Sequence, residues 1–102
     1  MRLTIQQIQA ICNNANKYFG NDCQIWLFGS RVNDKAKGGD IDLYIESAIL
    51  PISSLITGKL YFLRDLHLQI GEQKIDLVLR RCDSGVDLPI YTIAKQTGVQ
   101  LQ

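Results

Sequence analysis

Apolar residues recur along the chain at two spacings, and each spacing predicts one kind of element. Near the N-terminus the spacing is helical, at Ile5, Ile8, Ile11, Cys12 and Ala15. Thr4 is expected to cap this helix, with Gln7 as its capping-box partner. Gly20-Asn21-Asp22 is expected to end it.

Three later segments, residues 24–28, 40–46 and 74–79, are expected to be strands. The last two alternate between apolar and polar residues, as half-buried strands do. The first is a short strand with Ile25 and Leu27 on one face and Trp26 and Phe28 on the other. In the last two, the apolar positions share one face, at Ile41, Leu43 and Ile45 and at Ile75, Leu77 and Leu79. Residues 29–39 are polar, basic and glycine-bearing, which predicts a loop with room for one helical turn.

Two more helices are expected in the second half of the chain. A long one begins at Pro51 or at Ser53-Ser54, reaches about Ile70 and ends at Gly71. Its apolar stripe is predicted to contain Leu55, Ile56, Leu60, Leu63, Leu66 and Ile70. Residues 81–86 are expected to turn, and Pro89 begins a short last helix that ends at Gly98. The apolar face of that helix is predicted to hold Ile90, Ile93 and Ala94.

The connections between these elements predict how the strands pair. A helix joins residues 40–46 to residues 74–79, and such a crossover makes the two strands parallel. The first strand is expected to run antiparallel to the second. The 102 residues are expected to form a single domain, residues 1–102. The predicted fold class is α+β, a small mixed sheet with helices packed on one face and a functional site on the other.

Composition narrows the range of partners. A hydrophobic content of 46% is typical of a globular chain, and a net charge of +1 gives no broad positive field, so direct nucleic-acid binding is not expected. Cys12, Cys23 and Cys82 lack metal-ligand spacing and are expected to be reduced thiols of a cytoplasmic protein. No run approaches the roughly 18 apolar residues of a membrane span.

Three aspartates are the strongest candidates for a functional site. Asp40 and Asp42 are two residues apart on one strand and therefore face the same way. Asp76 is expected at the same edge of the parallel neighbour, in an otherwise apolar strand where an unpaired carboxylate is costly. Mg²⁺ prefers carboxylate and phosphate oxygens. Two such ions about 3.5–4 Å apart can clamp the attacking and leaving oxygens of a nucleotidyl transfer.

The loop after the first strand carries the residue types that hold phosphates. Gly29 allows backbone N–H groups to approach a phosphate closely, and Ser30 adds a hydroxyl donor. Arg31, Lys35 and Lys37 can neutralise a triphosphate. An antiparallel pairing of the first two strands brings this loop to the aspartates. A lone Gly-Ser pair or a lone aspartate is usually a turn or a cap, and only the combination indicates a site.

Other conspicuous residues have ordinary structural interpretations. His67 is expected to be partly buried and hydrogen-bonded. Trp26 and Phe28 are expected to pack, although they can also stack on a base. Arg80-Arg81 is expected to be a solvated strand end. Glu46 shares the acidic face but lies too far along its strand to join the aspartates.

The string Phe28-Gly29-Ser30-Arg31, followed by Gly38-Gly39-Asp40-Ile41-Asp42-Leu43-Tyr44-Ile45, resembles the minimal nucleotidyltransferases. These are the smallest members of the polymerase-beta-like nucleotidyltransferase superfamily. Their pattern is Gly-Ser, a loop, Asp-x-Asp and a third acid on a later strand, matched here by Gly29-Ser30, Asp40, Asp42 and Asp76. The likeness covers nearly the whole chain. It departs from the pattern where Gly38-Gly39 precedes Asp40, because a serine is common there.

The resemblance implies the polymerase-beta-like fold and transfer of a nucleoside monophosphate from an NTP, with ATP expected, to a hydroxyl. It implies two Mg²⁺ ions held by the catalytic acids Asp40, Asp42 and Asp76, and nucleotide binding by Gly29, Ser30 and Arg31. Members of this size often act as antitoxins beside a helical HEPN-domain ribonuclease toxin, and some adenylylate a tyrosine of that toxin. One alternative is an antitoxin that masks its toxin by contact. Another is transfer to a small molecule such as an aminoglycoside, which the lack of a second domain disfavours.

Overall fold

Three α-helices, one 3-10 helix and four strands make up the part of the chain that this computed structural model describes, residues 1–33 and 39–102. In chain order they are α1 (Ile5–Phe19), β1 (Gln24–Phe28), η1 (Gly29–Val32), β2 (Ile41–Ser47), α2 (Ile52–Ile70), β3 (Ile75–Arg81), α3 (Pro89–Thr97) and β4 (Val99–Gln100). The predicted helical turn in the first loop is confirmed as η1. Lys35 and Lys37, the two lysines expected to face a triphosphate, lie outside the described residues.

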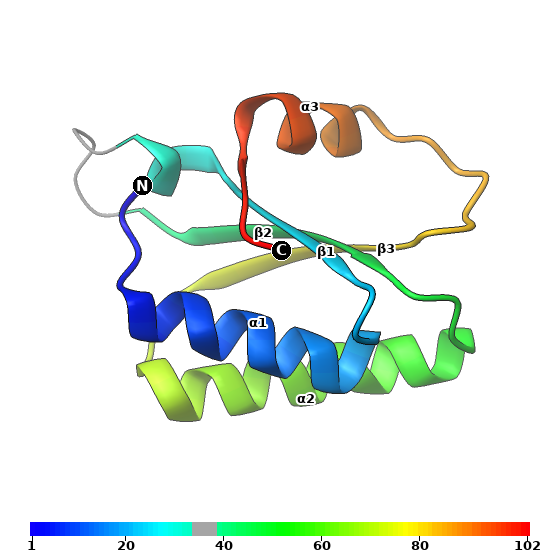
Figure 1. Cartoon of the computed structure of the whole chain (residues 1–102), viewed down its shortest axis with the longest axis horizontal. Coiled ribbons are helices and arrows are strands. Elements are labelled where there is room, and N and C mark those ends of the chain that lie inside the picture. Colours follow the sequence, from blue (N-terminus) through cyan, green and yellow to red (C-terminus); the bar gives the residue numbers. More distant parts are fainter. Residues whose placement is uncertain (34–38) are drawn as a thin grey trace.

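The strands form one mixed sheet in the order β3-β2-β1-β4 (Figure 1). β1 runs antiparallel to β2, and β2 runs parallel to β3 because α2 crosses over between them. Both predicted pairings are confirmed. The register places Phe28 opposite Asp42 and Asp42 opposite Asp76, so the end of β1 and the starts of β2 and β3 share one edge.

The fourth strand was not expected from the sequence. β4 pairs antiparallel with β1, with Leu27 opposite Val99. The chain then continues along β1, where Leu101 N donates to the Ile25 carbonyl over 2.7 Å and Ile25 N donates to the Gln102 carbonyl over 2.9 Å. A strand of two residues is too short to show any alternation. It covers the β1 edge of the sheet and leaves β3 as the other edge strand.

The main core lies between the sheet and the pair α1 and α2, which lie together on one face (Figure 1). The strands supply the alternating residues that the sequence predicted, among them Ile25, Leu27, Ile41, Leu43, Ile45, Ile75 and Leu77. The helices cover them with Ile11, Phe19, Phe62 and Leu66, all fully buried. The period-two pattern of the strands therefore identified the core face correctly.

The opposite face carries a second apolar cluster, and this corrects the predicted fold. Helices were expected on one face only, yet α3 packs on the other (Figure 1). Tyr91 of α3 stacks on Tyr44 with ring centroids 5.4 Å apart, and Tyr44 stacks on Trp26 at the same distance. Two large rings on the polar-looking face of β1 and β2 need a cover, because exposed aromatic surface is costly. The prediction that Trp26 is a packing residue is confirmed.

The apolar stripe of α2 is only partly buried. Leu55 and Leu66 lie in the core as predicted, but Ile56 and Leu60 are 62% and 65% exposed, and Phe62 is buried instead. The sheet covers only part of the circumference of α2, so apolar residues at the margins of the stripe are exposed to solvent. For the same reason Ile93 of α3, predicted on its apolar face, is 49% exposed, whereas Tyr91 and Ala94 are buried.

The two ends of α1 lie where the capping residues in the sequence predicted them. Thr4 Oγ1 accepts from Gln7 N over 3.1 Å, and Thr4 N donates to Gln7 Oε1 over 2.9 Å, which is the predicted capping box. α1 ends at Gly20, whose φ of 96° suits glycine. Within residues 1–33 and 39–102, none of the helices combines the length and the apolar character needed to cross a membrane.

Cys12, Cys23 and Cys82 are free thiols, as expected. They are respectively half-buried, buried and exposed. Burial raises the pKa of the Cys23 thiol to about 11, which leaves it protonated and unreactive at neutral pH.

Candidate active site

Asp42 and Asp76 meet across the ladder between β2 and β3. The parallel register sets them directly opposite one another, and Asp40 precedes β2 by one residue on the same face. Asp42 is half-buried, whereas Asp76 is exposed at the outer strand. The sequence therefore placed all three acids correctly at one edge of the sheet.

The electrostatics of this edge favour a cation. The pKa of Asp42 is raised, first because burial removes water from its carboxylate and then because Asp76 and Asp40 are close negative charges. Lys74 opposes the rise but does not cancel it. Carboxylates that repel one another are stabilised by a bound divalent ion, whose charge reverses the local balance.

Asp40 has a different partner from the other two acids. Its Oδ2 lies 3.3 Å from Lys74 Nζ, in an ion pair whose lysine is 71% exposed. Among the described residues no three His, Cys, Asp or Glu side chains stand ready to hold a metal ion together. The all-carboxylate donor set suits Mg²⁺. Asp42 and Asp76 lie opposite one another in the ladder, and Asp40 lies close enough to raise the pKa of Asp42 while it also pairs with Lys74.

Gly29 connects the loop to the acids. Its φ is +75°, and a Cβ at this position would collide with the Asp42 carboxylate and lie 3.1 Å from Asp42 Cγ. The turn that begins η1 therefore lies directly against Asp42, with space for a backbone but not for a side chain. Ser30 follows on the exposed side of the turn. The predicted contact of the loop with the carboxylates is present at Gly29, whereas the Ser30 side chain lies against Gly39.

Gly39 explains the departure from the nucleotidyltransferase pattern just before Asp40. Its φ is +92°, and a Cβ here would collide with Ser30 Oγ and lie 3.1 Å from Ser30 Cβ. A serine at position 39 would be strained in its backbone and would overlap Ser30. The two ends of the loop thus touch, and glycine is the residue that lets them do so.

Arginines 2 and 31 hold this loop in place. Arg31 donates from Nη1 to the Arg2 carbonyl and from Nη2 to Gln73 Oε1, both over 3.0 Å, and from Nε to the Gly39 carbonyl over 3.4 Å. In return Arg2 N donates to the Arg31 carbonyl over 2.8 Å, and the Arg2 guanidinium donates to the carbonyls of Ser30 and Asn33, each over 3.1 Å. Arg31 was expected to bind nucleotide. In the structure its guanidinium donates to the Arg2 and Gly39 carbonyls and to the Gln73 side chain. Arg2 was not singled out, because an isolated arginine near a terminus carries no motif.

The remaining candidates are engaged away from the aspartates. His67 Nε2 lies 2.8 Å from the Gln73 carbonyl, as expected of a hydrogen-bonded histidine. Glu46 accepts from Tyr44 Oη over 2.6 Å and pairs with Lys95 Nζ at 2.8 Å, which confirms that it is not part of the acid cluster. Arg80 corrects the expectation of a solvated strand end. Its guanidinium lies 4.6 Å from the centre of the Tyr91 ring, and its Nε is buried.

No model of a known protein family matches the chain, and no curated protein matches it. The interpretation of the site therefore depends on its geometry and on the chemistry of its donors. Two facing carboxylates, a third within one residue of β2 and a backbone turn against the central carboxylate can bind a divalent ion together with a phosphate chain.

Proposed function

We propose that this chain is a metal-dependent nucleotidyltransferase of the polymerase-beta-like kind. It transfers a nucleoside monophosphate, AMP from ATP in the expected case, to a hydroxyl of a partner protein. The observation that carries the proposal is the contact between Gly29 and the Asp42 carboxylate, with Asp76 opposite Asp42 in the ladder. A phosphate held at the turn would lie directly beside the carboxylates.

Asp40, Asp42 and Asp76 would hold the metal, with two Mg²⁺ ions expected. When bound, these ions neutralise phosphate charge and lower the pKa of the attacking hydroxyl. The raised pKa of Asp42 supports this role, because a carboxylate that repels its neighbours gains most from a cation. Asp40 would give up its ion pair with Lys74 to hold the metal, and this would cost little because the lysine is largely exposed.

The reaction is an in-line displacement at phosphorus. The acceptor oxygen forms a bond to the α-phosphorus while the bond from that phosphorus to the bridging oxygen of the β-phosphate breaks. Pyrophosphate leaves with the electron pair, and Asp76 or water takes the hydroxyl proton. Gly29 and Ser30 position the phosphates from the turn. Arg31 positions this turn through Arg2 and Gln73, since its guanidinium already donates to them.

The partner is proposed from the family resemblance. A HEPN-domain ribonuclease toxin beside an antitoxin of this size would offer a tyrosine hydroxyl as the acceptor. The alternative is a binding module that masks the toxin by contact. One observation favours it: Asp40 pairs with Lys74 rather than joining the other two acids. Both functions need a partner, and they differ in whether the carboxylates are used.

Binding of a non-hydrolysable ATP analogue, measured by calorimetry with and without Mg²⁺, tests the chemical proposal. The wild-type chain is expected to bind only when the ion is present. Asp42→Asn should weaken binding by at least about tenfold, because a charged ligand at the centre of the cluster is lost. Glu46→Gln is the matched control, since this acid lies on the same strand but pairs with Lys95. Equal binding by the wild-type chain and Asp42→Asn, or full binding in chelator, would overturn the proposal.

Intact-mass measurement tests the proposed acceptor. A small helical protein encoded beside this chain, incubated with it, ATP and Mg²⁺, is expected to gain one AMP group per modified tyrosine. The gain should be absent with Asp42→Asn and present with Glu46→Gln. Tight binding without any gain in mass would favour the masking function.

A further inference from the structure

β3 presents an unpaired backbone edge. The Lys74 carbonyl accepts from Ile41 N, and Cys82 N donates to the Ser47 carbonyl, each over 3.0 Å. Backbone groups alternate between the two sides of a strand in a parallel ladder. The even-numbered residues of β3 therefore bond to β2, and the odd-numbered ones point outward. In the described part of the chain no strand pairs with this outer side.

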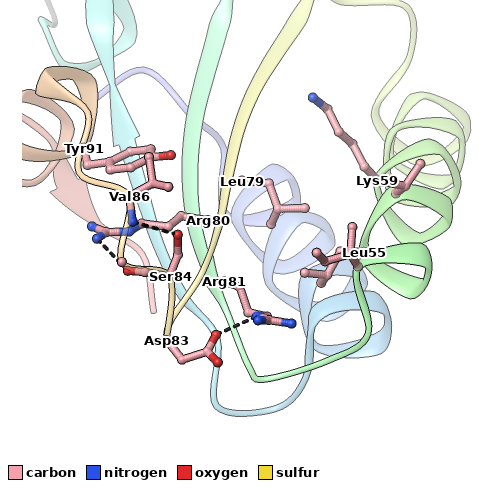
Figure 2. Close-up of a pocket in the computed structure, with 12 residues that line it drawn as sticks. Leu55, Lys59, Leu79, Arg80, Arg81, Asp83, Ser84, Val86 and Tyr91 are labelled. Carbon is pink, nitrogen blue, oxygen red and sulfur yellow. Dashed lines mark hydrogen bonds and ion pairs between the residues drawn. The ribbon is translucent and has the colours of Figure 1, made fainter.

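A groove lined by apolar residues and by the charged residues Lys59, Arg80, Arg81 and Asp83 lies along this edge. It has a volume of about 590 Å³ and is lined by the first two turns of α2, the second half of β3, residues 83–86 and Tyr91. Figure 2 shows Leu55 and Lys59 of α2 on one side, Val86 and Tyr91 on the other, and β3 between them. Ile52 and Ile56 line the groove, and Leu60 lies one turn further along α2; they are 64%, 62% and 65% exposed.

An open edge with an apolar centre is unusual in a protein that acts alone. Native sheets block such edges with prolines, bulges, charges or a covering element. The centre of β3 is Leu77-Val78-Leu79, and the charged residues lie toward its ends. The exposed stripe on α2 runs beside the same edge. Both features are explained if one partner covers them together.

We propose that two copies of this chain pair antiparallel through β3, forming one continuous sheet across a two-fold axis at Val78. The exposed stripe of α2, Ile52, Ile56 and Leu60, then packs against the same stripe of the second copy.

Charge complementarity selects this register. An axis at Val78 sets Asp76 opposite Arg80 of the second copy on one face, where the Arg80 guanidinium also lies over Tyr91 and donates to the Ser84 carbonyl. An axis at Leu77 would instead set Lys74 opposite Arg80, and like charges directly opposite are destabilising. An axis at Leu79 would set Asp76 opposite Cys82 and Arg80 opposite Val78, so it would pair no opposite charges. Among these three registers, only the one centred on Val78 pairs opposite charges and matches leucine with leucine.

The backbone supports the same register. Leu77 and Leu79 both point outward, so an axis at Val78 lets each bond to the other residue of the second copy through both its N–H and its carbonyl. The Arg81 carbonyl already accepts from Ser84 N over 2.9 Å, so the ladder is centred on the leucines. On the α2 side, Leu79 lies beside Leu55 in the groove and continues the core of each copy toward the other.

The first test is the oligomeric state in solution, measured by sedimentation equilibrium across the micromolar range. The wild-type chain is expected to dimerise. Ile56→Glu should raise the dimer dissociation constant at least about tenfold, because it places two unpaired carboxylates in the contact. Leu68→Glu is the matched control: the same change on the same helix, at a residue 79% exposed and outside the groove, should leave dimerisation unchanged.

The second test reads the register directly. In a non-hydrogen-bonded antiparallel pair the Cα atoms are about 4.5 Å apart, close enough for a disulfide. Val78→Cys, in a Cys82→Ser background, is expected to form a covalent dimer on mild oxidation. Val86→Cys is the control, since it lies in the groove but away from the axis.

Amide hydrogen exchange completes the design. The amides of Leu77 and Leu79 should become protected as the concentration rises, whereas the amide of Val78, bonded within the sheet, should be protected throughout. A monomer at every concentration, a dimer unaffected by Ile56→Glu, or rapid exchange of both leucine amides in the dimer would overturn the proposal. Because none of these readouts uses nucleotide, their failure would leave the proposed transfer activity standing.

Discussion

At the scale of single residues, the candidate site depends on two positions with no space for a side chain. Gly29 lies against the Asp42 carboxylate, and Gly39 lies against Ser30. Both have positive φ, so backbone conformation and steric contact require glycine for separate reasons. The loop is thereby held against Asp42, the acid that a phosphate would approach in the proposed reaction.

Gly39→Ser separates these two reasons. We expect it to weaken binding of an ATP analogue at least about tenfold, because the new Cβ displaces Ser30 from the turn. Gly71→Ser is the control, since Gly71 has φ +89° but no atom within 4 Å of an added Cβ. Both variants should lose about 1–3 kcal/mol of stability from the backbone strain. Comparable affinities in the two variants, measured by calorimetry, would show that the contact with Ser30 has no part in binding.

The two acids on β2 with shifted pKa values provide a second residue-scale prediction. Burial and the charges of Asp76 and Asp40 raise the pKa of Asp42. Burial would also raise the pKa of Glu46, but hydrogen bonds from Lys95 and Tyr44 outweigh it and hold that pKa below its ordinary value. The ionised form is thus unfavourable in the fold at Asp42 and favourable at Glu46.

The sign of each effect on stability follows by linkage. At neutral pH without Mg²⁺, Asp42→Asn should raise the free energy of unfolding, by less than about 1 kcal/mol because the site is open to water. This gain should vanish as the pH falls through the raised pKa of Asp42. Glu46→Gln should lower stability at neutral pH, and its loss should shrink on acidification. Urea unfolding at several pH values measures both. A loss of stability for Asp42→Asn at neutral pH would contradict the crowding of charges at Asp42.

At the scale of elements, sequence patterns predicted what was local and periodic. The alternation in residues 40–46 and 74–79 placed both strands, and the crossover helix between them fixed their parallel pairing. These two patterns alone were enough to predict that Asp40, Asp42 and Asp76 lie at one edge of the sheet. The capping box at Thr4 and the glycines after the helices predicted the helix ends. Each of these signals depends only on a few neighbouring residues, so it can be recognised in the sequence.

What the sequence did not reveal depends on contacts distant along the chain. β4 consists of two residues and is positioned by hydrogen bonds to β1 rather than by its own pattern. The face that α3 covers is decided by Trp26 and Tyr44, far away in sequence. The hydrogen bonds between Arg2 and Arg31 likewise join two parts of the chain that carry no shared motif. Apolar residues on α2 were assigned to the core because spacing alone cannot show how wide the sheet is.

The role of α3 can be tested through its anchor. Tyr91 is 8% exposed, stacks on Tyr44 and contacts the Arg80 guanidinium. Tyr91→Ala should lower the free energy of unfolding by about 3 kcal/mol, since it removes a large buried ring. Ile93→Ala, at a residue 49% exposed on the same helix, should change it by less than about 0.5 kcal/mol. Similar losses in the two variants, measured by urea unfolding, would mean that α3 does not close the second face.

At the scale of the whole molecule, chemistry and contact surface occupy different places. The acids lie where β2 and β3 begin, whereas the groove lies along the second half of β3 and the first turns of α2; of the three acids, only Asp76 also lies in the proposed contact between two copies. The acids are polar and partly exposed, and they contribute little apolar area to any contact. Loss of the Asp40 and Asp42 carboxylates should therefore leave the proposed binding surfaces intact.

Because Asp40 and Asp42 can be changed without changing the proposed binding surfaces, a variant can distinguish an enzyme from a masking protein. In cells that produce the proposed toxin partner, a chain with both Asp40→Asn and Asp42→Asn is expected to co-purify with the partner but fail to protect growth. Binding survives because the changed side chains are nearly the same size as the originals, and transfer fails because the metal loses two of its three protein ligands. Glu46→Gln, which changes an acid on the same strand outside the cluster, should bind and protect. Full protection by the double variant would make masking by contact the function of this chain, and loss of co-purification would show that the acid edge itself is part of the binding surface.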